Sequence, residues 1–338
     1  MKKNEPPTLE DVARLANVST ATISRSINEP DKVAEKTRSR IQQIIDAVGY
    51  TPNFGARVLA RSRSNTVGAI IPTMENAMFA SGLQAFQETL AASGVTLLVA
   101  SSGYSTDHEF SQIRSLVTHG ADGLMLIGSS RPQETLDFLA LRNVPYVLSW
   151  CCPADTSKPY AGFDNSAAAH ALTMEILHLG HRNIAMIAGK REGNDRANNR
   201  VEGVMRAVQE FGSSATLSAV VESAYQLEQG GIAFEQLMSS PKKPSAIICG
   251  NDVLAAGAVL RADRIGIRVP HDVSITGFDD ISLASVVSPT LTTVRVPQID
   301  MGKSAAKLLL GLLADEQPES LEFATEIIHR ESLAPPAN

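Results

Sequence analysis

Short apolar runs alternate with longer amphipathic stretches through most of this chain, and this rhythm limits the folds open to it. Apolar runs occupy 67–71, 96–100 and 123–127, with amphipathic stretches at 78–93 and 107–118 between them. The pattern continues through apolar runs at 145–149, 183–188, 246–249 and 274–278. Apolar runs of strand length separated by segments of helix length predict parallel β-strands covered by α-helices.

The number of these runs predicts more than one sheet. The chain has 338 residues, which is enough for about two or three domains. Because about ten strands would strain a single doubly wound sheet, we expect two similar α/β subdomains. Ligands of such sheets bind beyond the carboxyl ends of the strands, so two facing subdomains would enclose a cleft.

The composition excludes several classes of protein. With 43% hydrophobic and 20% charged residues, it is typical of a globular chain rather than a fibrous or disordered one. No apolar run approaches the roughly 18 residues of a membrane helix. The first residues, MKKNEPPTLEDV, lack the apolar core of a signal peptide. We therefore expect a cytoplasmic protein that does not bind membranes and is not a periplasmic receptor.

No motif for catalysis or cofactor binding stands out in the sequence. It has no G-x-G-x-x-G, Walker or G-x-S-x-G motif, and its seven histidines lack the spacing of metal ligands. The cysteines Cys151, Cys152 and Cys249 suit neither a disulfide framework nor a zinc site. We expect a protein that is not an enzyme and that needs neither a cofactor nor a metal.

Charge is unevenly distributed along the chain. The whole sequence has a formal net charge of −6, which argues against a nucleic-acid partner. Residues 1–64, however, include 11 basic and 7 acidic residues, a net of +4, whereas residues 65–338 include 19 and 29, a net of −10. A basic head on an acidic body predicts a nucleic-acid-binding module joined to a domain with another task.

The basic head has the pattern of a helix-turn-helix unit. Thr8 and Asp11 suit the capping box of a first helix, Ser19 can cap a second helix that follows a short turn, and a third helix is predicted over 35–48. The second helix would expose a short polar face made of Thr20, Ala21, Ser24, Arg25 and Asn28. Such a face suits a recognition helix in the major groove, although an ordinary helical hairpin has the same spacing.

Motifs along nearly the whole chain resemble those of the lactose/galactose repressor (LacI/GalR) family. The head motifs are TLEDVARLANVSTATISRSIN and VAEKTRSRIQQIIDAVGYTPN, and the body motifs are GAIIP, GHRNIAMIAG, CGNDVLAAGA, VSITGFDD and IIHRES. The resemblance implies an all-α helix-turn-helix headpiece and an α/β core of the type I periplasmic-binding-protein fold, with two doubly wound subdomains linked by three crossovers. It also implies a DNA-binding transcriptional regulator, which we expect to be a repressor.

The resemblance implies domain boundaries as well. It places the DNA-binding domain at 1–52, a hinge helix or linker at 53–64, and an effector-binding and dimerisation domain at 65–334. One lobe of that last domain is expected at about 65–163 plus 290–320, and the other at about 164–289 plus 321–334.

Contacts with DNA are carried over residue by residue. The positions that match the family's base-reading face are Thr20, Ala21 and Arg25. The remaining matching DNA contacts are Thr8, Ser19, Ser24, Asn28, Thr37, Tyr50, Asn53, Ala56 and Leu59. Arg25 offers two donors to guanine, whereas Ala21 can touch only an apolar feature such as a thymine methyl group. A surface ion pair with Glu29 is the alternative role of Arg25.

Residues 53–60, NFGARVLA, match the family's hinge segment. A segment this short does not hold a helix alone, so we expect it to be coil in free protein and helical on DNA. Leu59 matches the leucine that enters the minor groove, and a leucine buried in the linker is the alternative. Gly55 and Ala34 depart from the family, and they should weaken the hinge and the cap of the third helix respectively.

Motif matches in the core imply six effector contacts: Phe79, Asp164, Arg196, Arg200, Asn251 and Asp279. An aromatic face with carboxylate, amide and guanidinium groups suits a polyhydroxylated ligand such as a sugar. Two arginines four residues apart could also clamp a carboxylate, so a sugar acid is a second candidate. For the carboxylates, capping of the next helix is the alternative role, credible for Asp279 and Asp252.

One short recognition helix binds a half-site weakly, so we expect a homodimer on a palindromic operator. The family's dimer seam includes the helix after GAIIP, here 78–93, and the chain ends in HRESLAPPAN without the leucine heptads of tetrameric members. Effector binding is expected to close the cleft and to change how the two hinges pair. The change could weaken DNA binding, which is induction, or strengthen it, which is corepression.

Overall fold

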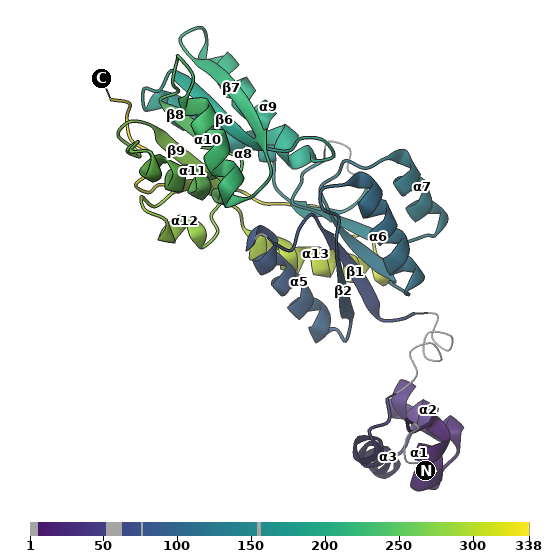
Figure 1. Ribbon diagram of the computed structural model, residues 1–338. Helices are drawn as coiled ribbons and strands as arrows, with labels where there is room; N and C mark the ends of the chain where they lie inside the picture. The colour runs from purple at the N-terminus through teal and green to yellow at the C-terminus, as the bar shows by residue number, and fades with distance from the viewer. Residues whose placement is uncertain (1–5, 52–62, 76, 154–156, 338) are drawn as a thin grey trace. The chain divides into compact units, whose positions relative to one another are not determined.

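The computed structural model describes residues 6–51, 63–75, 77–153 and 157–337. Contacts divide the chain into two compact units, Met1–Ser64 and Asn65–Asn338. We call the first unit the head and the second the body, and each is described by itself. Figure 1 shows a head made of helices and a body in which helices cover two sheets. None of the described helices is long and apolar enough to cross a membrane.

The described residues of the head form three helices, α1 (Leu9–Ala16), α2 (Thr20–Asn28) and α3 (Glu35–Val48), with a 3-10 turn η1 (Pro30–Lys32) before the last. Their apolar sides meet in a small core around Val12, Ala16, Ile23 and Ile41. Burial of these side chains packs α1 and α2 against α3, and the predicted helix-turn-helix fold of the head is confirmed.

Local capping explains where the helices of the head begin. Thr8 and Asp11 form a capping box, in which Thr8 Oγ1 accepts the Asp11 N–H at 3.2 Å and Asp11 Oδ2 accepts the Thr8 N–H at 3.1 Å. Ser19 Oγ accepts the N–H of Thr22 at 3.1 Å at the start of α2. Helix α3 follows Ala34, which makes no side-chain cap, as expected.

The first lobe of the body is built on a parallel sheet of six strands in the order β11-β5-β4-β3-β1-β2. The strands are β1 (Thr66–Ile71), β2 (Thr96–Ser101), β3 (Gly123–Ile127), β4 (Tyr146–Ser149), β5 (Tyr160–Gly162) and β11 (Leu321–Glu322). Helices α5 (Ala80–Ala92) and α13 (Gln298–Leu313) cover one face, and α6 (Thr106–Thr118) and α7 (Gln133–Leu141) cover the other. Side chains alternate along β1 accordingly, with Val67 and Ala69 facing α5 and Ile70 facing α6.

The second lobe has a sheet in the order β12-β10-β9-β8-β6-β7, parallel except for β12. Its strands are β6 (Asn183–Gly189), β7 (Thr216–Ser223), β8 (Ala246–Cys249), β9 (Ser274–Asp279), β10 (Thr292–Arg295) and β12 (Glu326–Ile328). Helices α8 (Asn165–His178) and α9 (Asp195–Phe211) pack on one face, and α10 (Leu227–Met238) and α11 (Asp252–Arg264) on the other, with the short α12 (Leu283–Val286) beside them. The predicted fold class of two doubly wound lobes is thus confirmed.

Glycines bring α5 and α13 into backbone contact. A Cβ atom on Gly302 would lie 2.0 Å from the carbonyl oxygen of Gly82, and one on Gly82 would lie 2.5 Å from the ring of Trp150. No larger residue fits at either position without displacing backbone or ring. This close packing fixes the start of α5 and the turn η2 (Ala77–Phe79), which carries Phe79 into the space between the lobes.

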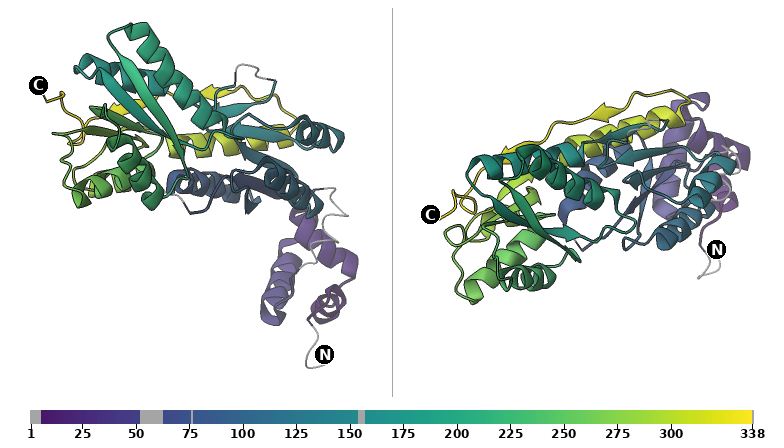
Figure 2. Two further views of the ribbon diagram at one scale, coloured as in Figure 1. Left: turned by 45° about the horizontal axis from the view of Figure 1, so that its top comes forward. Right: turned by 90° about the horizontal axis from the view of Figure 1, so that it is seen from above.

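Within the described residues the chain crosses between the lobes three times, and two of the crossings correct the expected boundaries. We expected 290–320 to lie in the first lobe and 321–334 in the second. Instead, β10 is a strand of the second sheet and β11 is a strand of the first, so the crossings fall between β10 and α13 and between β11 and β12. Strands of four and two residues have too little periodicity to be read from sequence. Figure 2 shows the C-terminal segment, in yellow, passing along both lobes.

Candidate functional site

The exposed side of α2 is the candidate DNA-reading surface of the head. Thr20, Ala21 and Arg25 are exposed, whereas Ser24 and Asn28 are half-buried at the edge of the same face. The alternative partner of Arg25 is engaged elsewhere, because Glu29 pairs with Lys32 Nζ at 2.7 Å. The described ion pairs do not include Arg25. Its guanidinium group is therefore open to a partner outside the head.

The other predicted DNA contacts lie around this surface. Thr8 and Ser19 are the N-caps of α1 and α2, so each stands beside backbone N–H groups that can bind phosphate. Thr37 lies in the first turn of α3 and Tyr50 directly after its C-cap, and both are half-buried. Asn53, Ala56 and Leu59 lie outside the described residues.

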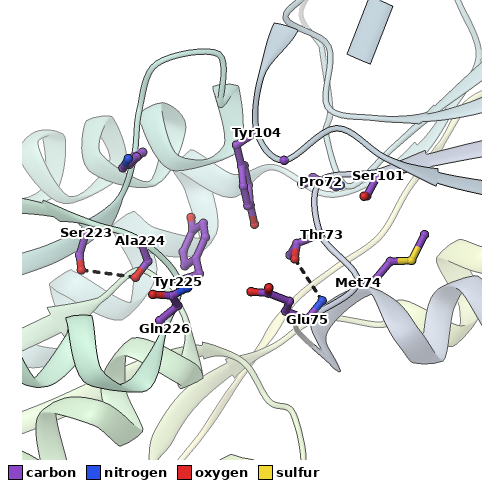
Figure 3. A pocket seen from close by; sticks show the side chains of 12 residues that line it. Pro72, Thr73, Met74, Glu75, Ser101, Tyr104, Ser223, Ala224, Tyr225 and Gln226 are labelled. Carbon is purple, nitrogen blue, oxygen red and sulfur yellow. Dashed lines mark hydrogen bonds between the residues drawn. The ribbon is translucent and has the colours of Figure 1, made fainter. Parts of the chain in front are cut away.

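A cavity of about 490 Å³, the outer cleft, opens at the carboxyl ends of strands from both lobes. The first lobe lines it with residues 72–75 after β1 and with Tyr104 after β2. The second lobe lines it with Lys190 after β6 and with residues 223–226 at the end of β7. Figure 3 shows Tyr104, Tyr225 and Glu75 around this space. A cleft at this edge of two parallel sheets is the ligand position that the sequence predicts.

Two tyrosines, one from each lobe, form the inner wall of the outer cleft. The ring centroids of Tyr104 and Tyr225 lie 5.5 Å apart with 42° between the planes. Burial raises the pKa of both hydroxyls, so they remain neutral hydrogen-bond donors. The Tyr104 hydroxyl is buried and makes no hydrogen bond with the described residues. Tyr104 and Trp150 adopt left-handed φ angles of 61° and 58°, a strained conformation that is common in binding sites.

Behind the tyrosines lies a smaller space, the inner chamber. It is lined by Met78, Phe79, Tyr104, Trp150, Asn194, Arg196, Arg200 and Tyr225. Phe79 packs edge-on against Trp150 with 5.4 Å between the ring centroids. The chamber combines aromatic walls with two guanidinium groups, and its free volume of about 10 Å³ is the room of about one water molecule.

Arg200 is a structural arginine at the base of this chamber. Its Nε donates to Asn165 Oδ1 at 2.9 Å, one Nη to the carbonyl oxygen of Gly250, and the other Nη to Asp279 Oδ1 at 3.3 Å. Its guanidinium group also lies 3.8 Å from the ring centroid of Phe278. All three nitrogens of Arg200 therefore donate to protein acceptors, which anchors it at the base of the chamber, and its part in a two-arginine clamp stays a prediction.

Arg196 has a different environment. Only its Nη1 has a described partner, Asp195 Oδ1 at 2.9 Å. Asp195 in turn crosses to the first lobe, where its Oδ2 accepts the Ser129 N–H at 2.6 Å and the Ser129 hydroxyl at 2.9 Å. Gly128 makes room for this contact, because a Cβ atom there would lie 2.1 Å from Arg196 Nη1. The pair Asp195 and Arg196 is thus held between the lobes.

The remaining predicted effector contacts divide into two groups. Asn251 and Asp279 lie beside the chamber, since Asn251 Nδ2 is 3.9 Å from Met78 Sδ and Asp279 accepts from Arg200. Asn251 is also the N-cap of α11. Asp164, by contrast, is exposed, and its carboxylate accepts the N–H groups at the start of α8. The structure therefore gives Asp164 the alternative role of helix cap.

Two buried carboxyls lie close together in the second lobe. Burial, with the nearby Asp279 charge, raises the pKa of Asp252 to about 8. Burial also raises the pKa of Asp279 to about 6, although Arg200 opposes the shift. Asp252 Oδ1 accepts the hydroxyl of Thr293 at 2.6 Å and its Oδ2 accepts the Ile281 N–H at 2.8 Å. Asp252 therefore ties α11 to β10 rather than facing a ligand.

These raised pKa values predict a stability that falls as pH rises. Between the unfolded pKa of about 4 and the folded values, the folded state binds more protons than the unfolded state, so the free energy of unfolding should drop from pH 5 to pH 8, by at most about 1.4 kcal/mol per pH unit for each group. Asp252→Asn should flatten this slope, because it removes one of the two titrating carboxyls. The Thr293 hydroxyl can accept from the new amide, so the contact between α11 and β10 is kept. Urea unfolding at a series of pH values, followed by the fluorescence of Trp150, the single tryptophan, measures this slope.

A matched control is available for this measurement. Asp272 is an exposed carboxyl whose pKa is lowered to about 2 by hydrogen bonds from Arg268, so Asp272→Asn should leave the slope between pH 5 and pH 8 unchanged. An Asp252→Asn profile parallel to the wild-type profile would contradict the assignment.

The sequence did not predict four residues of the site: Tyr104, Tyr225, Trp150 and Lys190. Tyr225 follows β7, a partly exposed edge strand that the apolar pattern did not reveal. Tyr104 and Trp150, however, follow strands that were predicted, so an aromatic residue just beyond a strand was an available signal. The described residues contain no group of three His, Cys, Asp or Glu side chains that could hold a metal ion.

Two family models match the chain. The model described as "Bacterial regulatory proteins, lacI family" matches residues 8–53. The model described as "Periplasmic binding protein-like domain" matches residues 174–333. The two matches fall in the head and in the body respectively.

Individual relatives match along nearly the full length. The HTH-type transcriptional repressor PurR of Shigella dysenteriae serotype 1 is 32% identical over 331 residues, which cover 97% of each chain. A LacI-family transcriptional regulator from Silicibacter pomeroyi has a solved structure with a TM-score of 0.88 and 23% identity, covering 97% of this chain and 100% of its own. The solved complex of the regulator CelR with cellobiose has a TM-score of 0.68 and 27% identity, covering 96% and 99%.

Proposed function

This chain belongs to the lacI family of bacterial regulatory proteins, and we propose that it represses transcription by binding a palindromic operator as a homodimer under the control of a small metabolite. Membership of the family makes it a DNA-binding transcriptional regulator with an effector-binding domain. The proposal assigns DNA binding to residues 1–52, the hinge to 53–64, and effector binding and dimerisation to 65–334. Its site of action is the cytoplasm.

The exposed face of α2 is the main support for the proposed DNA binding. Ser19 caps the helix, so Thr20 and Ala21 stand at its first turn and Arg25 one turn later. In a helix-turn-helix protein, this N-terminal part of the second helix is the part that meets base edges. The net charge of +4 over residues 1–64 supplies the attraction for phosphates.

An exposed apolar surface supports the homodimer. Helices α10 and α11 leave Leu227, Ile232 and Leu260 exposed around a groove of about 520 Å³, although both helices bury their other faces in the core. Arg264 and Glu228 border the groove with opposite charges, whereas Arg261 is already paired with Glu235. An apolar patch with a charged rim suits a second copy of the same chain, because each copy would present both charges. We therefore propose that the dimer interface includes this surface as well as the expected seam along α5.

The cleft supports a polar metabolite as the effector. It offers aromatic faces from Tyr104, Tyr225 and Trp150, together with amide, hydroxyl and guanidinium donors. This lining suits a sugar or a sugar acid, whose ring carbons pack on aromatic faces while its hydroxyl groups form hydrogen bonds. The solved complex of CelR with cellobiose is consistent with a carbohydrate effector.

The effector would control DNA binding by changing the relative arrangement of the two lobes. A ligand in the outer cleft contacts residues of both lobes, so it binds one lobe arrangement better than another. In a dimer, a change in lobe arrangement alters the separation of the two chains at Thr66, where the first strand of the body begins. That separation decides whether two hinge segments can pair on DNA.

A selection experiment tests the proposed function. Full-length protein is used to select duplexes from a random pool, and the enriched sequence is then titrated with a panel of sugars and sugar acids present. We expect a palindromic sequence, one dimer per duplex, and at least one compound that changes the dissociation constant about 5-fold or more. Enrichment of a non-palindromic sequence, or operator binding that no compound alters, would contradict the corresponding part of the proposal.

A further inference from the structure

We propose that Ser129 and Asp195 form a latch that holds the two lobes of the body closed, so that the protein's own contacts favour one lobe arrangement before an effector acts. Ser129 belongs to the first lobe, shortly after β3, and Asp195 is the first residue of α9 in the second lobe. The consequence for operator affinity rests on the proposed function, whereas the latch itself does not.

The latch is a carboxylate of one lobe held by donors of the other. Asp195 Oδ2 accepts the N–H of Ser129 at 2.6 Å and the hydroxyl of Ser129 at 2.9 Å. Hydrogen bonds to a charged acceptor are stronger than those between neutral groups. Burial alone would raise the pKa of Asp195, but the charge of Arg196 and the hydrogen bonds from Ser129 lower it below its usual value. Asp195 is therefore an ionised acceptor at neutral pH.

The two lobes fit closely at this point. A Cβ atom on Gly128, in the first lobe, would lie 2.4 Å from Asp195 Oδ1 and 2.1 Å from Arg196 Nη1. A Cβ atom on Gly193, just before α9, would lie 3.2 Å from Cγ2 of Thr106 in the first lobe. The start of α9 is thus seated against the segments that follow β2 and β3.

Charges from both lobes surround the carboxylate of the latch. Arg196, beside it on α9, donates from Nη1 to Asp195 Oδ1 at 2.9 Å. Arg131 of the first lobe is buried with Glu109, and its positive charge also lowers the pKa of Asp195. If the lobes parted, Asp195 would keep Arg196 but lose Ser129 and the nearby charge of Arg131. Loss of these partners by a buried carboxylate is costly, which favours the closed arrangement.

The latch lies away from the crossings that join the lobes. These crossings leave β5, β10 and β11, which lie at or next to one edge of their sheets. Ser129 and Asp195 instead follow β3 and β6, which lie towards the other edge of each sheet. A contact at a distance from the crossings restrains rotation of the lobes more than a contact beside them.

Trp150, the single tryptophan, can report on lobe opening. It is 1% exposed and lines the inner chamber, whose walls in the second lobe include Arg200 and Tyr225. Parting of the lobes would remove those walls and admit water and a soluble quencher. Acrylamide quenching of tryptophan fluorescence therefore measures opening in the absence of DNA and of an effector.

Latch variants of the dialysed full-length protein test the proposal. Asp195→Ala removes both hydrogen bonds, Ser129→Ala removes one, and Gly128→Ala breaks the contact whether the lobes or the Asp195 side chain move. We expect the acrylamide quenching constant to rise about 2-fold or more in Asp195→Ala and Gly128→Ala, and less in Ser129→Ala. Affinity for the selected operator should change in the same direction in all three variants, by about 5-fold or more in the first two.

Matched controls separate the latch from local strain. Gly94→Ala introduces the same left-handed strain in the first lobe, at a φ of 70°, but its Cβ atom has no neighbour within 4 Å. Asp107→Ala removes an exposed carboxylate from the first turn of α6, as Asp195→Ala does from α9. Both controls should match the wild type in quenching and in operator affinity. Melting temperatures show which variants are folded, and Ser129→Ala, the mildest change, decides if the other two are not.

Two results would overturn the latch: wild-type quenching in folded latch variants, or an equal rise in the Gly94→Ala and Asp107→Ala controls. Raised quenching with an unchanged operator affinity would support the latch and contradict the proposed coupling between the lobes and DNA binding. Failure of the latch and failure of the proposed function are thus distinguishable.

Discussion

Arg25→Ala is expected to abolish specific operator binding. Arg25 is exposed on the second turn of α2 and has no described ion pair, so its two-donor edge can reach a guanine in the major groove. Each lost bidentate contact costs about 1 to 3 kcal/mol, and a dimer loses two of them, so specific affinity should fall by about 2 to 6 kcal/mol. Fluorescence anisotropy with the selected operator and with a scrambled duplex measures the sequence-specific and the non-specific affinity separately.

Arg40→Ala is the matched control for this change. Arg40 is also an exposed arginine of the head, but it lies on α3. Both variants remove one positive charge per chain, so both should weaken binding to the scrambled duplex by a similar small factor. Only Arg25→Ala should remove the preference for the operator. Equal losses on both duplexes, or an unchanged operator affinity, would refute the role of Arg25.

Ile23→Ala separates recognition from folding. Ile23 is fully buried in the head core, so this variant should lose DNA binding because the head unfolds, with a loss of helical signal by circular dichroism. Arg25→Ala should retain that signal, which distinguishes the two causes.

The head could be predicted in detail from sequence because its signals are local. The capping box of Thr8 and Asp11 and the cap from Ser19 each lie within three or four residues of the helix they start. The apolar positions of α1 to α3 then leave one arrangement that buries Val12, Ile23 and Ile41 together. Neither signal depends on a distant part of the chain.

The body was predictable only where strands are fully buried. Strands such as β3 and β8 read as continuous apolar runs, because helices cover both of their faces. The edge strand β7 and the short β10, β11 and β12 carry no such run, and with them the lobe boundaries and Tyr225 were missed.

The effector site could not be predicted from the sequence alone, for a different reason. Sequence motifs pointed to Arg196 and Arg200 as equivalent, since both lie on one face of one helix. Their difference arises from partners far along the chain: Ser129 for the Asp195 beside Arg196, and Asn165, Gly250 and Asp279 for Arg200. Which acceptors each arginine meets is decided by tertiary contacts that no local spacing encodes.

Ile232→Asp combined with Leu260→Asp is expected to convert the proposed dimer into a monomer. Ile232 on α10 is 53% exposed and Leu260 on α11 is 46% exposed, and both line the groove proposed as part of the dimer surface. Burying two unpaired carboxylates per chain would cost several kcal/mol, which is enough to dissociate an interface of ordinary size. Light scattering at micromolar concentration should give the mass of one chain, 36.0 kDa, instead of two.

Operator affinity should fall with the dimer, because a monomer reads a single half-site. The loss should reach at least 100-fold in anisotropy, since the second head is no longer held near its half-site and must bind independently. Leu141→Asp is the control, because Leu141 is 81% exposed on α7 of the first lobe and away from α10 and α11. It should leave both mass and affinity unchanged. A double variant that remains dimeric would place the seam elsewhere, and a tetramer mass for the wild type would refute the dimer itself.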